Sequence, residues 1–268
     1  MPPVLETRQS GEHARTAKMP GHWLLARLGK KVLRPGGMEL TRKLIDALGI
    51  GAADDVIEFA PGLGITAKLA LERGPKSYIG VERDEAAAHI VRENLGGCDQ
   101  ECIVSSADDT GLPGHSATVV YGEAMLTMQS PEQKRRIMSE AARLLRPGGH
   151  YGIHEIALSP DDLDGAVRDR IARELSGAIR HRVVPLTKTG WIGHFELFGM
   201  EVCAEAISPM RLLEPRRLIQ DEGIGRALRF AWNVARHPEA RKRVMAMRRV
   251  FRKFQDHMVA IMLVGRKR

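Results

Sequence analysis

Long apolar runs and cysteines are both scarce in this chain of 268 residues. No apolar run approaches the roughly 18 residues that a membrane-spanning helix needs, and residues 1–21 lack the apolar core of a secretory signal. The three cysteines, Cys98, Cys102 and Cys203, are few and odd in number, which favours a reducing compartment. Cys98 and Cys102 have no histidine or further cysteine close by, so we expect no metal site there. These absences predict a cytoplasmic protein without a transmembrane segment.

The positive charge of the chain is unevenly distributed. The net charge of +8 fits a nucleic acid, an anionic membrane surface or an acidic substrate as partner. Its densest block is residues 236–253, where Val244, Met247 and Phe251 recur at helical spacing between Arg and Lys. This pattern predicts an amphipathic helix. Its basic face is either simply solvated or in contact with a polyanion or a membrane surface.

Short apolar segments alternate with helical patterns through the middle of the chain. The predicted strands are residues 55–59, 77–81, 101–105, 117–121 and 150–156. The predicted helices between them are residues 66–73, 85–94 and 131–145. This alternation predicts an α/β fold with a doubly wound parallel sheet.

The two ends of the chain depart from this alternation. Residues 1–50 contain two short predicted helices, which we interpret as an N-terminal helical cap or lid over a domain of residues 51–268. Near the C-terminus, predicted strands at 200–206 and 257–265 flank a mostly helical insertion, residues 207–256. Such an insertion suggests a subdomain over the edge of the sheet.

A glycine turn follows the first predicted strand, in the sequence VIEFAPGLGIT of residues 56–66. Gly62 and Gly64 have no Cβ, so the backbone of the turn can approach a ligand closely. Glu58 places a carboxylate near the end of the strand. The turn therefore predicts a small-ligand site at the carboxyl edge of the sheet.

Acidic residues follow the next two strands as well. Glu82 stands 20 residues beyond Gly62, the spacing at which an acid binds ribose hydroxyls in nucleotide-binding sheets. Asp108 follows the third strand, where a carboxylate can accept a hydrogen bond from an exocyclic amine. Glu58 would repel a pyrophosphate but attract an ammonium or sulfonium group. Together these acids favour a cationic nucleoside cofactor.

This order of features resembles the class I S-adenosylmethionine-dependent methyltransferases, over residues 55–156. The likeness is greatest to the small-molecule branch of ubiquinone and menaquinone biosynthesis methyltransferases, the methyltransferase type 11 group. The run LLRPGG of residues 144–149 and the acid Glu155 match that group, whereas Ala60 stands where the family has its first glycine. The resemblance implies a Rossmann-like seven-stranded sheet, mostly parallel with an antiparallel last strand. It also implies S-adenosyl-L-methionine as cofactor and S-adenosyl-L-homocysteine as product.

The resemblance assigns a place to each acid in the cofactor site. Glu58 and the backbone of residues 60–64 would hold the methionine end, and Glu82 the ribose. Asp108 and the backbone amide of Asp109 would hold the adenine. The full cofactor-binding set that it implies is Glu58, Ala60, Gly62, Gly64, Glu82, Arg83, Asp108, Asp109 and Glu123.

A catalytic base is needed only if the methyl acceptor must lose a proton. The candidates near the ends of the fourth and fifth strands are Glu123, His154 and Glu155, of which we assign Glu123 and His154 as catalytic. Strand alternation places His154 and Glu155 on opposite faces of the sheet. His22 and Trp23 are candidates for the N-terminal lid.

Three alternatives to a small-molecule methyltransferase remain open. Gly62-x-Gly64-x-x-Ala67 also fits a nicotinamide-dependent oxidoreductase, although Glu58 and Asp108 argue against one. The first motif also resembles the ribosomal RNA adenine dimethyltransferases, and the basic C-terminal region would suit RNA. Those enzymes have Asn-Leu-Pro-Tyr after the fourth strand, where this chain has YGEA at residues 121–124, and its aromatic content of 4% offers few platforms for base stacking. A non-catalytic ligand-binding role is the third alternative.

The acceptor is indicated only by composition. The insertion is rich in Leu, Met, Phe and Arg, which predicts an apolar pocket with a cationic rim. We therefore expect a small hydrophobic or amphipathic acceptor, acidic or lipid-like, methylated on O, N or C. The chain is expected to be a monomer or a homodimer.

Overall fold

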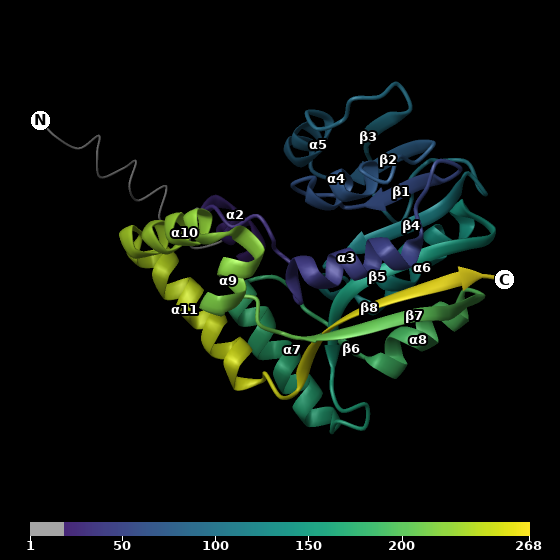
Figure 1. The fold of residues 1–268 in the computed structure, drawn as a ribbon. Helices are drawn as coiled ribbons and strands as arrows, with labels where there is room; N and C mark the ends of the chain where they lie inside the picture. The colour runs from purple at the N-terminus through teal and green to yellow at the C-terminus, as the bar shows by residue number, and fades with distance from the viewer. Residues whose placement is uncertain (1–18) are drawn as a thin grey trace, which may run out of the picture.

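A single mixed sheet forms the centre of the computed structural model, which describes residues 19–268 (Figure 1). Its strand order is β3-β2-β1-β4-β5-β8-β7, and the short strand β6 pairs with β5 outside this path. The strands are β1 (Asp55–Phe59), β2 (Ser77–Glu82), β3 (Gln100–Val104), β4 (Ala117–Glu123), β5 (Leu145–Leu158), β6 (Leu186–Thr187), β7 (Met200–Pro209) and β8 (Met258–Lys267). β1 to β5 are parallel, whereas β8 runs antiparallel to both β5 and β7. The predicted mostly parallel sheet with an antiparallel last strand is confirmed, and β6 is a two-residue addition to its seven main strands.

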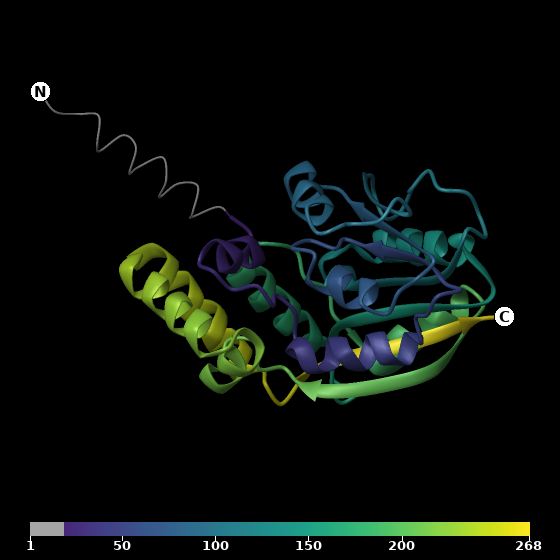
Figure 2. The ribbon, with the colours of Figure 1, turned by 45° about the horizontal axis from the view of Figure 1, so that its top comes forward.

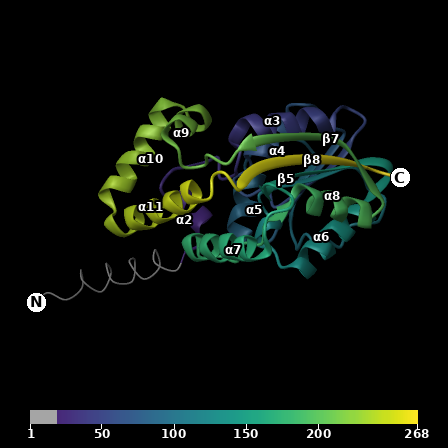
Figure 3. The same cartoon turned by 90° about the horizontal axis from the view of Figure 1, so that it is seen from below.

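Helices cover both faces of the sheet (Figure 3). On one face, Leu40 and Leu44 pack with Tyr78, Tyr121 and Met262 of the strands. The helices of this side are α3 (Gly37–Leu48), α4 (Ile65–Leu71) and α5 (Glu85–Arg92). The other face is covered by α6 (Pro131–Leu144) and α8 (Lys188–Leu197). Burial on both faces explains why the central strands are continuous apolar runs.

A second group of helices lies beyond one end of the sheet (Figure 2). It consists of α2 (Gly21–Arg27), α7 (Gly165–Ile179), α9 (Pro215–Glu222), α10 (Ile224–Arg236) and α11 (Pro238–Lys253). These helices share a separate apolar core that includes Leu24, Ile171, Phe230 and Val244. The predicted insertion therefore forms three helices that join an N-terminal helix in one cluster.

The predicted N-terminal cap divides between the two groups. Residues 1–18 lie outside the described residues. α2 joins the helical cluster, whereas α3 is an integral layer of the sheet because Leu40, Leu44 and Leu48 are buried against it. Within residues 19–268 no helix has the length and apolarity to cross a bilayer.

Candidate functional site

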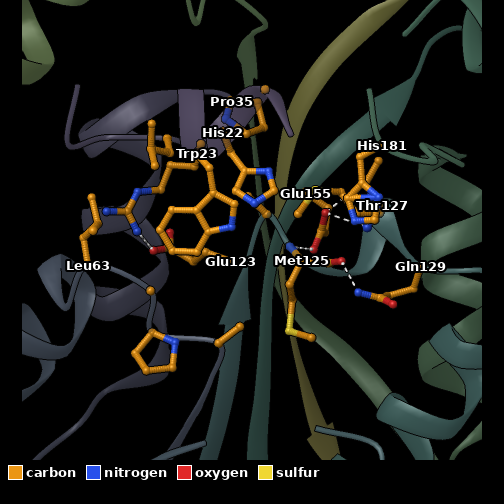
Figure 4. A pocket seen from close by; sticks show the side chains of 18 of the residues that line it. His22, Trp23, Pro35, Leu63, Glu123, Met125, Thr127, Gln129, Glu155 and His181 are labelled. Carbon is orange, nitrogen blue, oxygen red and sulfur yellow. Dashed lines mark hydrogen bonds and ion pairs between the residues drawn. The ribbon is translucent and has the colours of Figure 1, made fainter. Parts of the chain in front are cut away.

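A cavity of about 420 Å³ opens at the carboxyl ends of the parallel strands (Figure 4). This size lies within the usual range of small-molecule sites. Its glycine-loop half is formed by residues 60–63, 65 and 66 and by the ends of β1, β2 and β4, while Gly64 is not part of the lining. Its helix half is lined by α2, by α11 and by the residues after α7 and β7. The sheet and the helical cluster thus enclose one continuous space.

The glycine loop has the conformation that its residues predict. Gly62 and Gly64 have φ values of 56° and 71°, in the left-handed region that glycine enters readily. Ala60 shares this region with a φ of 53°, which costs a non-glycine residue about 1–2 kcal/mol. A Cβ added to Gly62 would meet no atom closer than 3.8 Å, so the space over this residue is open. The loop leaves room for a ligand against the backbone.

Glu82 is held in a fixed orientation at the end of β2. Its Oε2 accepts a hydrogen bond from the Gly62 amide at 3.1 Å. Its Oε1 accepts from the amides of Arg83 at 2.8 Å and Asp84 at 3.1 Å. Glu82 and Arg83 both line the cavity, where the sequence predicts them. Three backbone donors therefore fix the carboxylate toward which a ribose would bind.

Glu58 also lines the cavity, and one of its carboxylate oxygens accepts hydrogen bonds from two tyrosines. Its Oε2 accepts from the hydroxyls of Tyr78 at 2.6 Å and Tyr121 at 2.8 Å. Burial raises the pKa of Glu58 to about 7, and burial beside Glu58 raises the pKa of each tyrosine well above its usual value. No hydrogen bond from residues 19–268 reaches Oε1 of Glu58. One oxygen thus has no protein donor in this part of the chain.

The two aspartates after β3 do not line the cavity. The lining there is residues 105–107 instead. The Asp108 carboxylate accepts a hydrogen bond from the Ser106 hydroxyl, which lowers the pKa of Asp108, and the Asp109 amide donates to the Ser106 carbonyl at 3.1 Å. In this conformation the Asp109 amide is engaged within its own turn, and the adenine contact that the resemblance implies stays a prediction.

Glu123, at the end of β4, is the centre of a buried cluster. Its Oε1 accepts from Thr41 at 2.7 Å and lies 2.7 Å from Nδ1 of His154. Its Oε2 accepts from Thr66 and from the guanidinium of Arg34. Burial alone would raise the pKa of Glu123, but Arg34 and then His154 lower it to about 2. Glu123 is therefore an ion-paired carboxylate, and all four contacts come from the protein.

His154 is fully buried and is not part of the cavity lining. Its Nδ1 faces Glu123, and its Nε2 faces the carbonyl oxygen of Pro35. Both ring nitrogens are therefore engaged by acceptors, and neither is available to a methyl acceptor. In this conformation His154 links β5 to the loop before α3, and its role as a base stays a prediction that this geometry does not favour.

Glu155 lies on the opposite face from His154, as strand alternation predicts. It accepts hydrogen bonds from the amides of Met125 at 2.9 Å, Leu126 at 2.6 Å and Thr127 at 3.0 Å, and from the Thr127 hydroxyl at 2.6 Å (Figure 4). Burial raises the pKa of Glu155, while these donors oppose the rise. Glu155 thus fixes the segment after β4, which forms part of the cavity wall.

The cavity also contains two residues outside the predicted catalytic and cofactor-binding set, Arg34 and His22. Arg34 was not a candidate, because nothing in the turn LRPGG of residues 33–37 marks it as a partner of Glu123. His22 lines the helix half, with its ring centroid 6.3 Å from that of His181. Its Nδ1 is buried and has no hydrogen-bond partner among residues 19–268. Burial, and then the neighbouring His181, lower the pKa of His22 to about 4, so the imidazole is neutral near pH 7.

Comparison with known families and sequences agrees with this geometry. The sequence model of a family described as "Methyltransferase domain" matches residues 56–149. An uncharacterised protein of Haemophilus influenzae is 35% identical over 251 residues, which cover 90% of this chain and 96% of that protein. The ribosomal RNA small subunit methyltransferase A of Maridesulfovibrio salexigens is 39% identical over 61 residues, which cover only 23% of this chain and 22% of that protein.

Solved structures share the fold at low sequence identity. The crystal structure of MccD protein has a TM-score of 0.68 at 18% identity, over 88% of this chain and 99% of that chain. Geranyl diphosphate methyltransferase in complex with S-adenosylmethionine has a TM-score of 0.61 at 14% identity, over 86% and 85% of the two chains. Both similarities concern the whole arrangement of sheet and helices.

Proposed function

Because this chain belongs to the class I S-adenosylmethionine-dependent methyltransferases, we propose that it methylates a small hydrophobic or amphipathic molecule bound in the helix half of the cavity. The observation that carries this proposal is the continuity of the cavity. One space runs from the glycine loop to a wall formed by Ile179, Met210, Met247 and Phe251. A cofactor on the loop and an apolar acceptor against the helices would therefore share one cavity.

The residues of the glycine-loop half fit the cofactor. The open space over Gly62 admits a ligand against the backbone, and Glu82 is oriented by three amides to accept from ribose hydroxyls. The Glu58 oxygen without a described donor suits the cationic methionine end. When bound, S-adenosylmethionine supplies a methyl group on a positively charged sulfur. The protein's part is to orient the reactants and exclude water, which can supply much of the rate of an in-line displacement.

The helix half favours an acceptor that is mostly apolar. His22, on α2, offers this half a buried nitrogen, Nδ1, that has no hydrogen-bond partner among residues 19–268. A neutral imidazole at this place would accept a hydrogen bond from an acceptor hydroxyl or N–H and so orient the atom to be methylated. Lys31, also in the cavity wall, is the cation that would meet an acidic group on the acceptor.

RNA is the second candidate acceptor. It is favoured by the short match to a ribosomal RNA methyltransferase and by the positive net charge. Against it, the match covers 23% of the chain, and the wall of the helix half is mostly apolar, with few aromatic platforms for bases. The family assignment leaves no support for the nicotinamide alternative.

A methylation screen with methyl-labelled S-adenosylmethionine tests the acceptor class. The full-length chain is incubated with separate pools of lipids, quinols, phenols, organic acids and RNA. We expect label in a solvent-extractable small molecule, and we expect His22→Ala to lower kcat/KM for it at least tenfold. His194→Ala serves as the matched control, because His194 hydrogen-bonds the Gly190 carbonyl on α8 and is not part of the cavity lining. Label confined to RNA would overturn the proposal.

A further inference from the structure

Helix α10 carries apolar side chains on two sides. Its inner side packs into the helical cluster through Ala227, Phe230 and Val234. Its outer side presents Ile224, Leu228 and Trp232, which are 67%, 66% and 62% exposed. These three residues are spaced four apart, so they form one stripe along the helix. We call them the outer stripe.

The outer stripe is part of a wider concentration of exposed apolar groups. Nine large apolar side chains are exposed in residues 19–268, and five of them lie on α9, α10 and α11. The two beyond the stripe are Ile219 on α9 and Met245 on α11. Single exposed apolar residues need no explanation, but a contiguous set on one helix face indicates an interaction site.

The same helices hold the entire positive excess of the chain. Residues 210–253 contain 13 Arg and Lys against 4 Asp and Glu, a net of +9, whereas the whole chain has +8. All four acids make contacts within the protein. Glu222 is buried and accepts from the amides of Lys31 and Val32 at 2.8 Å. Glu214 forms ion pairs with Arg248 and Arg252. The cations of these helices are therefore only partly neutralised.

Two of these cations flank the outer stripe. The guanidinium of Arg236 lies 5.6 Å from the centre of the Trp232 ring, and Arg229 follows Leu228 directly. Both arginines are exposed, and neither forms an ion pair within the described part of the chain. Aliphatic, tryptophan and arginine side chains thus share one exposed helix face.

We propose that this face docks on an anionic lipid surface, with the outer stripe inserted at the headgroup level and Arg229 and Arg236 against the headgroups. A helix that lies in a membrane interface has this composition, with Leu and Trp on the buried side and Arg beside them. Anionic headgroups also complement the local charge of +9. A second copy of the chain on the same face would instead bring two such charges together.

Nucleic acid fits this face less well than lipid. Binding to a nucleic acid backbone depends on cations and stacking aromatics, and it gains little from exposed Ile and Leu side chains. Helix α11 packs beside α10 and contributes Met247 and Phe251 to the cavity wall. Docking through α10 would therefore place the acceptor half of the cavity near lipid, while the docking itself does not depend on which molecule is methylated.

Vesicle co-sedimentation of the full chain tests the proposal. Vesicles of phosphatidylcholine alone are compared with vesicles that also contain phosphatidylglycerol. We expect binding to the mixed vesicles only. We expect the double variant Leu228→Ser/Trp232→Ser to lose about tenfold or more of its affinity for the mixed vesicles. We expect Arg229→Gln and Arg236→Gln each to lose about fivefold of this affinity, since one arginine near an anionic surface contributes about 1 kcal/mol. The matched controls are Leu197→Ser, which removes an apolar side chain that is 62% exposed on α8, and Arg135→Gln, which removes an exposed cation on α6. Both should bind as the unmodified chain does.

Three results would overturn the proposal. The first is no sedimentation with anionic vesicles, or equal sedimentation of the outer-stripe variant and its control. The second is RNA binding that Arg229→Gln weakens without any vesicle binding, which would make the face a nucleic-acid surface. The third is a concentration-dependent dimer, seen by light scattering, that Leu228→Ser abolishes. All substituted side chains are exposed, and an unchanged melting temperature checks that each variant is folded.

Discussion

His154 Nδ1 and Glu123 Oε1 lie 2.7 Å apart, and these two residues are also register partners in the parallel pair of β5 and β4. Their side chains therefore join neighbouring strands at the edge where the cavity begins. Arg34 reaches Glu123 from the loop before α3, and Pro35 of the same loop accepts from His154. A buried ionic cluster thus fastens the loop to the sheet.

The first prediction concerns His154. Because its side chain is not part of the cavity lining, we expect His154→Gln to leave kcat within about tenfold and the shape of its pH profile unchanged. We expect a loss of about 1–3 kcal/mol in the free energy of unfolding, since a buried acceptor loses its donor. Urea unfolding and a pH–rate profile measure the two effects. A hundredfold or larger fall in kcat at unchanged stability would instead restore His154 as a base.

The second prediction concerns Arg34. Arg34→Met leaves the Glu123 carboxylate buried without its ion-pair partner, so we expect the free energy of unfolding to fall by about 3–5 kcal/mol. Arg34→Met/Glu123→Gln removes the uncompensated charge and should recover part of this loss. Denaturant titration of both variants measures the difference. Equal stability of the single and double variants would contradict the ionic role of the cluster.

Glu123 also predicts how stability responds to acid. Its folded-state pKa of about 2 lies below the ordinary value of 4.5, so the unfolded chain binds more protons between these two values. The stabilisation by Glu123 is therefore present above about pH 4.5 and is lost as the pH falls toward 2. In Glu123→Gln this part of the acid dependence should be absent.

The third prediction concerns Glu58 and cofactor affinity. With a pKa of about 7, Glu58 changes from neutral to ionised as the pH rises through neutrality. An ionised carboxylate attracts the cationic methionine end, so we expect affinity for S-adenosylmethionine to rise roughly tenfold across this range. Calorimetry at several pH values measures it. Glu58→Gln should show no such rise, and a rise of equal size in that variant would exclude Glu58 as its source.

Glu58 should affect stability in the opposite sense to Glu123. Its folded-state pKa is raised above the ordinary 4.5, so the folded protein binds more protons between about pH 4.5 and pH 7. The free energy of unfolding of the ligand-free protein should therefore fall by roughly 3 kcal/mol as the pH rises through this window. Glu58→Gln should remove the fall.

The sequence predicts the sheet and the glycine loop because local signals dominate there. β1 is buried along its whole length, and its predicted bounds agree with the structure. Gly62 and Gly64 occupy the left-handed conformations that their residue type favours. Glu82 follows from its spacing to Gly62. These features depend on neighbours in the chain, and sequence patterns describe such neighbours well.

The parts that the sequence does not predict depend on distant contacts. Helix α7 has only two buried residues, Ile171 and Leu175, so its apolar periodicity is weak. The loop that carries Arg34 is anchored to α9, where the amides of Lys31 and Val32 donate to Glu222 at 2.8 Å. Asp108 is not part of the cavity lining, and its carboxylate accepts from Ser106 within the local turn. In each case the position of the residue or helix depends on a contact with a distant part of the chain or on the conformation of one turn.

Titration of the full-length chain with S-adenosylmethionine, beside Glu82→Ala and the exposed control Glu101→Ala, tests the central claim most directly. We expect one cofactor molecule per chain and a loss of affinity of about ten- to hundredfold in Glu82→Ala, because its carboxylate accepts from the Gly62 amide, lines the cavity and is proposed to bind the ribose. Glu101→Ala, on β3 outside the cavity lining, should bind as the unmodified chain does. The absence of binding, or equal affinity in Glu82→Ala and the unmodified chain, would contradict a cofactor site on the glycine loop.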